Sequence, residues 1–333
     1  MAITMKDIAD LAGVNISTVS RALNNDKAIS EEVRQRIQDI AARQGYQRRK
    51  VAVKNISYVI DKGFFLLTSH FYNRIIEGIE EECKKNGYTF QFNSLEQNQF
   101  VPGNISIKNI AGMIVTSWYH DDFIREIEKI GIPLVLVDYY LPTEDISSIL
   151  SDKTDGVIKG IEHLASLGHR RIAYLRGDIT VLGSSDRLIG YRRAVDMFHL
   201  DRDENLILSC DFSIKSAYEA MKTFLGTTGE YPTAVMAIND IVAMGAMEAI
   251  KERGLKIPED ISVLGFDDID LASEVIPHLS TMHVKKRTMG RLAVQRLLDI
   301  IENREIEYTK IMLKPTLVVR ESTGPPSGLS PAV

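Results

Sequence analysis

The chain has 333 residues, more than one hydrophobic core usually covers, so two or three domains are expected. Hydrophobic residues make up 44% and charged residues 26%, as in ordinary globular proteins, and no apolar run is long enough to cross a bilayer. Lys6 and Asp7 lie where a secretory signal peptide would need an apolar segment. We therefore expect a cytoplasmic protein with no membrane partner. Cys83 and Cys210 lack neighbouring His or Cys, so neither a disulfide framework nor a metal site is expected.

The charge is unevenly distributed. Residues 1–54 carry ten Lys or Arg and six Asp or Glu, whereas the whole chain has a net charge of −5. A basic front segment on an acidic remainder favours an anionic partner for the front segment alone. A plain solvated surface could carry the same charge, so charge by itself does not decide.

Three short helical patterns fill residues 1–46. The first can be capped by the hydroxyl of Thr4 and ends at Gly13, and Asn15 and Ser30 are favourable caps for the second and third. A turn of a few residues between the first two helices has the spacing of a helix-turn-helix unit. The pattern therefore predicts an all-α headpiece over residues 1–46.

Apolar positions at helical spacing, among them Ile8, Leu11 and Ala12, predict one small core for these helices. The other face of the second helix carries short polar side chains and one arginine, with no acidic residue from Val14 to Asn25. Such a face can enter a major groove without repelling phosphates. The pattern favours a DNA-binding headpiece over a plain helical bundle.

The run MKDIADLAGVNISTVSRALN over residues 5–24 resembles the headpiece of the lactose/galactose repressor (LacI/GalR) family, and the resemblance continues through residues 30–46. It implies double-stranded operator DNA as partner, with Ile16, Ser17 and Arg21 where the family reads base edges. The chemistry agrees for Arg21, because a guanidinium can bind guanine O6 and N7 together. The positions that the resemblance assigns to phosphates are Thr4, Thr18, Ser20 and Asn24.

Residues 47–55 read as a short basic linker, in which Arg48 and Arg49 are expected beside phosphates. Typical family members have a longer connector, with an Asn and a hinge helix whose leucine enters the minor groove. This chain lacks that Asn and that leucine. We therefore predict no hinge helix or a reduced one, with weaker DNA bending than in members that have it.

Residues 56–322 alternate short apolar segments with helical stretches, which predicts parallel sheets with helices on both faces. The length favours two lobes, with a ligand cleft beyond the carboxyl ends of the strands. The Pro-, Ser- and Gly-rich residues 323–333 are expected to be a disordered tail. Strands are predicted at 56–60, 88–92, 112–115, 133–137, 171–175, 234–237 and 262–266, and helices at 73–86, 121–130, 154–167, 185–198 and 240–253.

The body also resembles the family's sensor domain, which is similar to periplasmic sugar-binding proteins. The resemblance rests on residues 168–173, 186–191, 237–240 and 257–268 and implies a small-molecule effector. Carried over by position, it implies effector contacts from Phe71, Trp118, Asp155, Arg187, Asn239 and Asp267, with Asp152 held less firmly.

Arginine and carboxylate side chains offer paired hydrogen bonds to vicinal hydroxyls, and aromatic rings pack on sugar faces, so a carbohydrate is favoured over a purine. Structural alternatives stay open. Asn239 could cap the helix that follows it, Asp267 could be a loop acid, and Phe71 and Trp118 could be packing residues. His169 is interpreted as a turn residue.

These features predict a sequence-specific DNA-binding transcription regulator, most simply a repressor, whose operator affinity is controlled by an effector. A homodimer is expected because one headpiece contacts too few bases for high affinity. The alternative is a sugar-metabolising enzyme or kinase with a DNA-binding appendage. No catalytic residue, cofactor or metal is predicted, since G-x-x-x-x-G-K-[ST], G-x-G-x-x-G, H-E-x-x-H and G-x-S-x-G patterns are missing.

Overall fold

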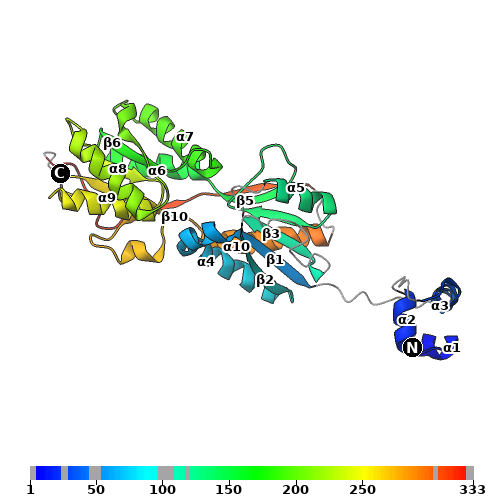
Figure 1. Cartoon of the computed structure of the whole chain (residues 1–333). Helices are drawn as coiled ribbons and strands as arrows, with labels where there is room; N and C mark the ends of the chain where they lie inside the picture. The colour runs from blue at the N-terminus through cyan, green and yellow to red at the C-terminus, as the bar shows by residue number, and fades with distance from the viewer. Residues whose placement is uncertain are drawn as a thin grey trace. The chain divides into compact units, whose positions relative to one another are not determined.

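The computed structural model describes residues 5–23, 29–44, 54–96, 109–116, 121–302 and 307–327. Contacts between residues divide the chain into two compact units, Met1–Val53 and Lys54–Val333 (Figure 1). In the described residues, no helix is long and apolar enough to cross a membrane.

The first unit is a three-helix bundle of α1 (Met5–Ala12), α2 (Ile16–Leu23) and α3 (Glu31–Arg43). Its buried core includes Ile8, Ala12 and Val19, and Gly13 turns the chain after α1 with a φ of 65°. Leu11, predicted to be in this core, is 56% exposed, because the eight-residue α1 buries only a narrow stripe. Ser30 occupies the N-cap position of α3, but its side chain makes no capping hydrogen bond. The predicted helix-turn-helix arrangement is confirmed.

The second unit contains two six-stranded sheets. The first has the order β11-β5-β4-β3-β1-β2 and the second β12-β10-β9-β8-β6-β7, and every pairing is parallel except β10 with β12. The strands are β1 (Asn55–Asp61), β2 (Thr89–Leu95), β3 (Gly112–Thr116), β4 (Leu134–Val137), β5 (Ser147–Ser151), β6 (Ile172–Arg176), β7 (Ile207–Ser209), β8 (Ala234–Ala237), β9 (Ser262–Asp267), β10 (Ser280–His283), β11 (Lys310–Leu313) and β12 (Thr316–Val318).

Helices cover both faces of each sheet, as predicted. The first sheet with its helices is called the first lobe, and the second sheet with its helices the second lobe. Residues that alternate along a strand pack on opposite faces: Tyr58 and Ile60 of β1 join one core, and Val59 joins another. The helices are α4 (Lys62–Lys85), α5 (Asp121–Ile130) and α10 (Lys286–Ile301) in the first lobe, and α6 (Lys153–Ser166), α7 (Leu182–Met197), α8 (Ile214–Thr227) and α9 (Asp240–Glu252) in the second. Two single-turn 3-10 helices are η4 (Glu204–Leu206) and η5 (Asp270–Ser273).

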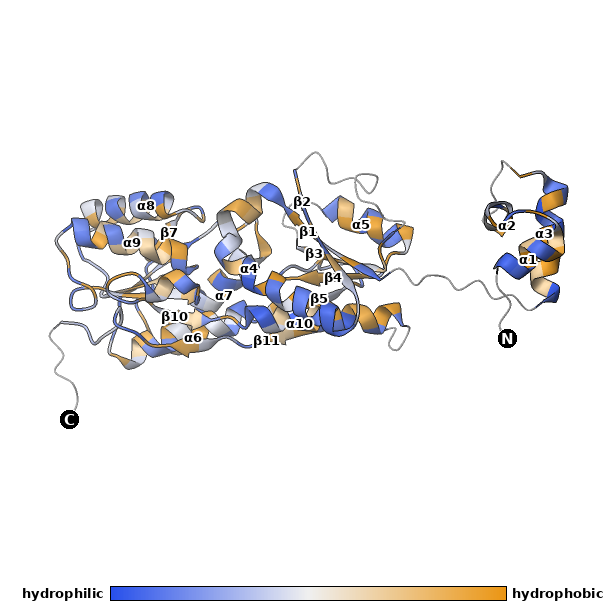
Figure 2. Cartoon of the chain, turned by 90° about the horizontal axis from the view of Figure 1, so that it is seen from below, coloured by the Kyte–Doolittle hydropathy of each residue, from blue (hydrophilic) through white to orange (hydrophobic). Residues whose placement is uncertain are grey.

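The chain passes between the lobes three times, after β5, after β10 and between β11 and β12. These crossings are short, so the carboxyl ends of several strands face one another across the boundary. Figure 2 shows the same layers coloured by hydropathy, with α4 and α10 of the first lobe carrying mixed apolar and polar faces. The sequence predicted a ligand cleft beyond these strand ends.

Two predicted boundaries differ from the structure by more than three residues. The helix expected from residue 73 begins at Lys62, because the Asp61 side chain accepts a hydrogen bond from the Phe64 amide and starts α4 earlier. The prediction of a disordered tail from residue 323 places its start too early in the sequence. The chain is still anchored at residue 324, because the Gly324 carbonyl accepts hydrogen bonds from the side chains of His169 and Ser262. His169 is therefore a fully buried anchor for this segment and not only a turn residue.

Candidate functional site

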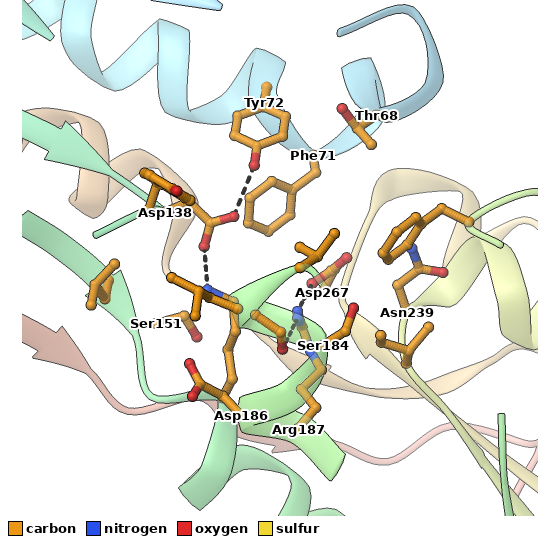
Figure 3. Close-up of a pocket in the computed structure, with 18 of the residues that line it drawn as sticks. Thr68, Phe71, Tyr72, Asp138, Ser151, Ser184, Asp186, Arg187, Asn239 and Asp267 are labelled. Atoms are coloured by element: carbon orange, nitrogen blue, oxygen red, sulfur yellow. Dashed lines mark hydrogen bonds and ion pairs between the residues drawn. The ribbon is translucent and has the colours of Figure 1, made fainter. Parts of the chain in front are cut away.

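One pocket lies at the boundary of the two lobes, beyond the carboxyl ends of β4, β5, β8 and β9 (Figure 3). Four of the six predicted ligand-binding residues, Phe71, Arg187, Asn239 and Asp267, line it. They come from α4, α7, β8–α9 and β9, so residues almost 200 positions apart in the chain meet at one site. The prediction of a cleft at the strand ends is consistent with this arrangement.

The other predicted positions lie elsewhere. Asp155 is not among the lining residues, because its carboxylate forms an ion pair with Lys159 at 2.7 Å along α6. Asp152 is also not in the lining and caps α6 by accepting a hydrogen bond from the Asp155 amide at 3.0 Å. Trp118 lies outside the described residues.

Arg187 and Asp267 form the charged centre of the pocket. An Arg187 Nη2–Asp267 Oδ1 distance of 3.5 Å links them, and the guanidinium lies 4.5 Å from the centre of the Phe266 ring. Burial raises the pKa of Asp267 to about 6, although the positive charges of Arg187 and Lys286 pull it down. Lys286 Nζ also donates to the Asp267 and Asp268 carbonyls, which fixes the end of β9, where both residues have positive φ.

Asp138, which the sequence analysis did not identify, is the centre of a second charged cluster in the pocket. Its carboxylate accepts hydrogen bonds from Tyr72 Oη and Lys153 Nζ, both at 2.8 Å. Tyr72 and Asp138 belong to the first lobe and Lys153 to the second, so this nearly buried ion pair links the lobes. Burial and the Asp138 charge raise the pKa of Tyr72, which stays a hydrogen-bond donor. Asp138 directly follows a predicted strand, which is the signal that could have found it.

Asn239 has the capping role that the sequence left open, and it also lies in the pocket lining. It lines the pocket and caps α9, because its Oδ1 accepts a hydrogen bond from the Val242 amide at 2.8 Å. The cap occupies the oxygen and leaves the amide NH₂ as a donor.

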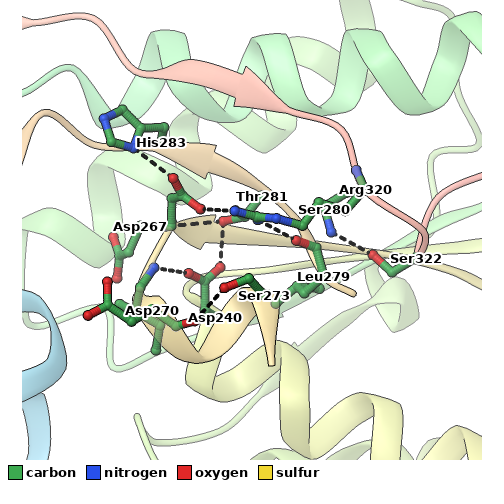
Figure 4. A network of polar contacts seen from close by, with 12 residues as sticks. Asp240, Asp267, Asp270, Ser273, Leu279, Ser280, Thr281, His283, Arg320 and Ser322 are labelled. Carbon is green, nitrogen blue, oxygen red and sulfur yellow. Dashed lines mark hydrogen bonds and ion pairs between the residues drawn. The ribbon is translucent and has the colours of Figure 1, made fainter. Parts of the chain in front are cut away.

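The floor of the pocket is formed by Asp240, whose carboxylate contacts Thr281 Oγ1 and the Ile269 amide (Figure 4). Complete burial, followed by the charge of Asp267, raises the pKa of Asp240 well above its usual range. An added Cβ at Gly265 would lie 2.2 Å from Asp240 Oδ1, so only glycine fits beside this carboxyl group. Asp240 is therefore held by its own hydrogen bonds within the protein, whereas Asp267 pairs with Arg187 at the centre of the pocket.

The first unit presents the predicted DNA-binding face. Ile16, Ser17 and Arg21 are exposed on α2, with Ile16 at 47%. Asn15 Oδ1 caps the helix by accepting hydrogen bonds from the Thr18 amide at 2.8 Å and from the hydroxyls of Ser17 and Thr18. Predicted contacts that lie outside the described residues are Thr4, Asn24, Arg48 and Arg49, and the side chain of Ser20 is not described.

Comparison with known proteins is consistent with both parts of the chain. Residues 4–49 match the family model of bacterial regulatory proteins, lacI family, and residues 161–323 match the model of a periplasmic binding protein-like domain. Both matches fall on segments where the sequence resemblance was found.

Full-length relatives are also similar. The chain is 32% identical to the ribose operon repressor of Haemophilus influenzae and 30% identical to the HTH-type transcriptional repressor PurR of Vibrio atlanticus, in each case over 96% of this chain and 98% of the relative. Among solved structures, it is similar to a complex of the transcriptional regulator CelR with cellobiose (TM-score 0.76, 26% identity, 96% of this chain and 99% of that one). It is also similar to the lac repressor dimer bound to operator and an anti-inducer (TM-score 0.72, 27% identity, 97% and 100%).

Proposed function

Because the chain belongs to the lacI family of bacterial regulatory proteins, we propose that it is a homodimeric, sequence-specific DNA-binding repressor whose operator affinity is set by a carbohydrate effector. One observation carries the proposal. Arg187, Asn239, Asp267 and Phe71, from four separate elements, converge on one pocket in a chain whose first unit exposes a capped polar helix.

The chemistry of the two surfaces supports these roles. In α2, Arg21 reads a guanine edge and Ile16 contacts a thymine methyl, since both side chains are exposed and no acid lies beside them. In the pocket, Arg187 and the Asn239 amide donate to hydroxyl oxygens, Asp267 accepts from hydroxyl groups, and the Phe71 ring packs against the apolar face of a sugar.

Regulation follows from the position of the pocket between lobes. A sugar that contacts Asp267 of one lobe and Phe71 of the other favours one arrangement of the lobes over another. In a dimer, this changes the separation of the two headpieces, and half-site spacing on DNA tolerates little change. The expected outcome is release of the operator when the effector binds.

The test is DNA binding to the region upstream of the protein's own coding sequence, titrated against sugars and the purines hypoxanthine and guanine. We expect nanomolar operator binding that one sugar weakens. Arg187→Ala should remove the response and keep DNA binding. An unchanged response in this variant would place the effector elsewhere, and no binding to any duplex would overturn the function.

An enzyme with a DNA-binding appendage is the alternative. We infer that the chain is not an enzyme, because its full-length relatives bear the names of repressors and phosphate-binding patterns such as G-x-x-x-x-G-K-[ST] are missing from its sequence. ATP turnover in the presence of a bound sugar would contradict this. As a regulator of bacterial genes, the protein is proposed to act in the cytoplasm.

A further inference from the structure

A second set of polar side chains lines the same pocket, and the sequence assigned none of them. Ser151 ends β5, Asp186 lies in α7, and Lys310 begins β11. We call these three residues the polar wall. Figure 3 shows Ser151 and Asp186 on one side of the pocket, and Asn239 on the opposite side.

The polar wall is partly desolvated and lacks partners. Ser151 is 4% exposed, and its hydroxyl has no hydrogen-bond partner in the described part of the chain. The carboxylate of Asp186 likewise has neither a hydrogen bond nor an ion pair to any described residue, and burial raises its pKa despite the nearby charges of Lys153 and Lys310. Buried polar groups without partners cost free energy, so a ligand that supplies partners binds favourably here.

Lys310 is also without a carboxylate contact in the described residues. Its Nζ lies 3.3 Å from the centre of the Tyr140 ring, and burial lowers its pKa even though Asp186 attracts it. Tyr140 belongs to the pocket lining as well, so the lysine and the ring form one side of the cavity. The ammonium group retains donors for a ligand.

The charges of this wall select the kind of ligand. A hydroxyl group can donate to Asp186 and accept from Lys310 at once, whereas a phosphate or carboxylate would be repelled by Asp186. The other cations of the lining, Lys153 and Arg187, already face Asp138 and Asp267. A neutral hydroxylated group therefore fits better than an anion.

Figure 3 shows Asn239 on the side of the pocket opposite Ser151 and Asp186, with Asp267 between the two sides and Arg187 next to Asp186. We propose, building on the function proposed above, that the effector is a neutral disaccharide: one ring contacts Arg187, Asn239 and Asp267, and the other contacts Ser151, Asp186 and Lys310. Ser151 is buried, Asp186 is half-buried and Lys310 is exposed. The polar wall therefore sets specificity for the second ring.

Isothermal titration calorimetry of the full chain tests this with D-ribose, D-glucose, D-galactose, cellobiose, maltose, lactose, melibiose, sucrose, trehalose and glucose 6-phosphate. We expect a disaccharide to bind most tightly. Asp186→Asn and Lys310→Met should each weaken its binding roughly tenfold, because each removes a hydrogen bond to a charged group. Neither variant should weaken binding of the disaccharide's component monosaccharide by more than about twofold.

Two matched controls remove the same charges outside the pocket lining. Asp196→Asn in α7 and Lys314→Met each affect a surface ion pair, with Asp196 62% and Lys314 70% exposed, and should leave all affinities unchanged. Tightest binding of a monosaccharide or of glucose 6-phosphate would overturn the second subsite and leave the regulator intact. If the protein binds operator DNA but no sugar, the proposals of a second subsite and of a carbohydrate effector are both wrong. The DNA-binding function would still stand.

Discussion

Arg187 Nη2 and Asp267 Oδ1 are 3.5 Å apart, too far for a strong hydrogen bond, although both side chains are buried and oppositely charged. Arg187 Nε has no hydrogen-bond partner in the described part of the chain, and Arg187 is held instead by the Gly183 carbonyl and the Phe266 ring. Both side chains are therefore fixed in position, while each keeps hydrogen-bonding capacity that the protein does not use. A ligand hydroxyl between the two groups could accept from the guanidinium and donate to the carboxylate.

Effector affinity should fall as the pH drops below about 6. Burial raises the pKa of Asp267 to about 6, so its carboxylate accepts hydrogen bonds at pH 7.5 and is mostly protonated at pH 5. Calorimetric titrations at pH 7.5, 6.5, 5.5 and 5.0 should show a constant affinity above pH 7 and a loss approaching roughly tenfold per pH unit at the acid end. An affinity that stays constant or increases toward pH 5 would contradict the role of Asp267 as acceptor.

Asp267→Asn should stabilise the ligand-free protein at neutral pH while abolishing its effector response. The pKa of Asp267 is higher in the folded chain than the ordinary 3.8, so the native state binds more protons between these values and becomes more stable as the pH falls through them. Asparagine mimics the protonated form at every pH and avoids burying a charge. Urea unfolding at pH 7.5 should show a gain of roughly 1–3 kcal/mol, and the gain should shrink at pH 4.5. A loss of stability at pH 7.5 would mean that the attraction between Arg187 and Asp267 outweighs desolvation.

Arg21→Ala should lower operator affinity while leaving effector binding unchanged, because the two sites lie in separate units. Loss of a bidentate guanine contact costs about 1–3 kcal/mol, or roughly 5- to 150-fold, and this loss should be confined to the preferred sequence. Fluorescence anisotropy on operator and scrambled duplexes measures both affinities. Arg43→Ala removes the same charge from the exposed last turn of α3 and serves as control. Equal losses on both duplexes would show that Arg21 contacts only phosphates.

Much of the fold could be predicted because strands such as β3 and β4 are mostly apolar runs with clear boundaries: Gly112 begins β3, Pro133 precedes β4 and Asp138 follows it. The site was predicted less completely. Asp138 could have been found from its position after β4. Nothing local marks Ser151 or Lys310, since β5 and β11 are neighbours in the first sheet but lie about 160 positions apart in the sequence. The pairing of Asp155 with Lys159, by contrast, follows from their i,i+4 spacing on a predicted helix and could have been found from the sequence.

Asn15→Ala should weaken DNA binding on every sequence by loosening α2. Asn15 Oδ1 accepts hydrogen bonds from the Thr18 amide and from two hydroxyls, and loss of such an N-cap costs about 0.5–2 kcal/mol. Hydrogen exchange of the full chain should show faster exchange for the amides of α2 and no change in the second unit. Asn15→Ser retains a capping oxygen and should restore most of the protection. Faster exchange in both variants would assign Asn15 a role beyond capping.

The operator should be bent only weakly. A minor-groove wedge has to unstack a base step, which costs a few kcal/mol, and an apolar side chain inserted between the bases offsets this cost. Residues 47–54 contain neither a leucine nor an asparagine, both of which a typical hinge helix of the family has, although residues 47–53 lie outside the described part of the structure. Gel shifts with circularly permuted operator fragments should therefore give nearly equal mobilities for central and terminal sites. Replacing Val51 with leucine is the matched variant, since it adds the missing side chain without changing the charge. A strong central kink in the unaltered protein would contradict this prediction. It would show that Val51 or Val53 can act as the wedge and that the linker forms more helix in the complex than its sequence predicts.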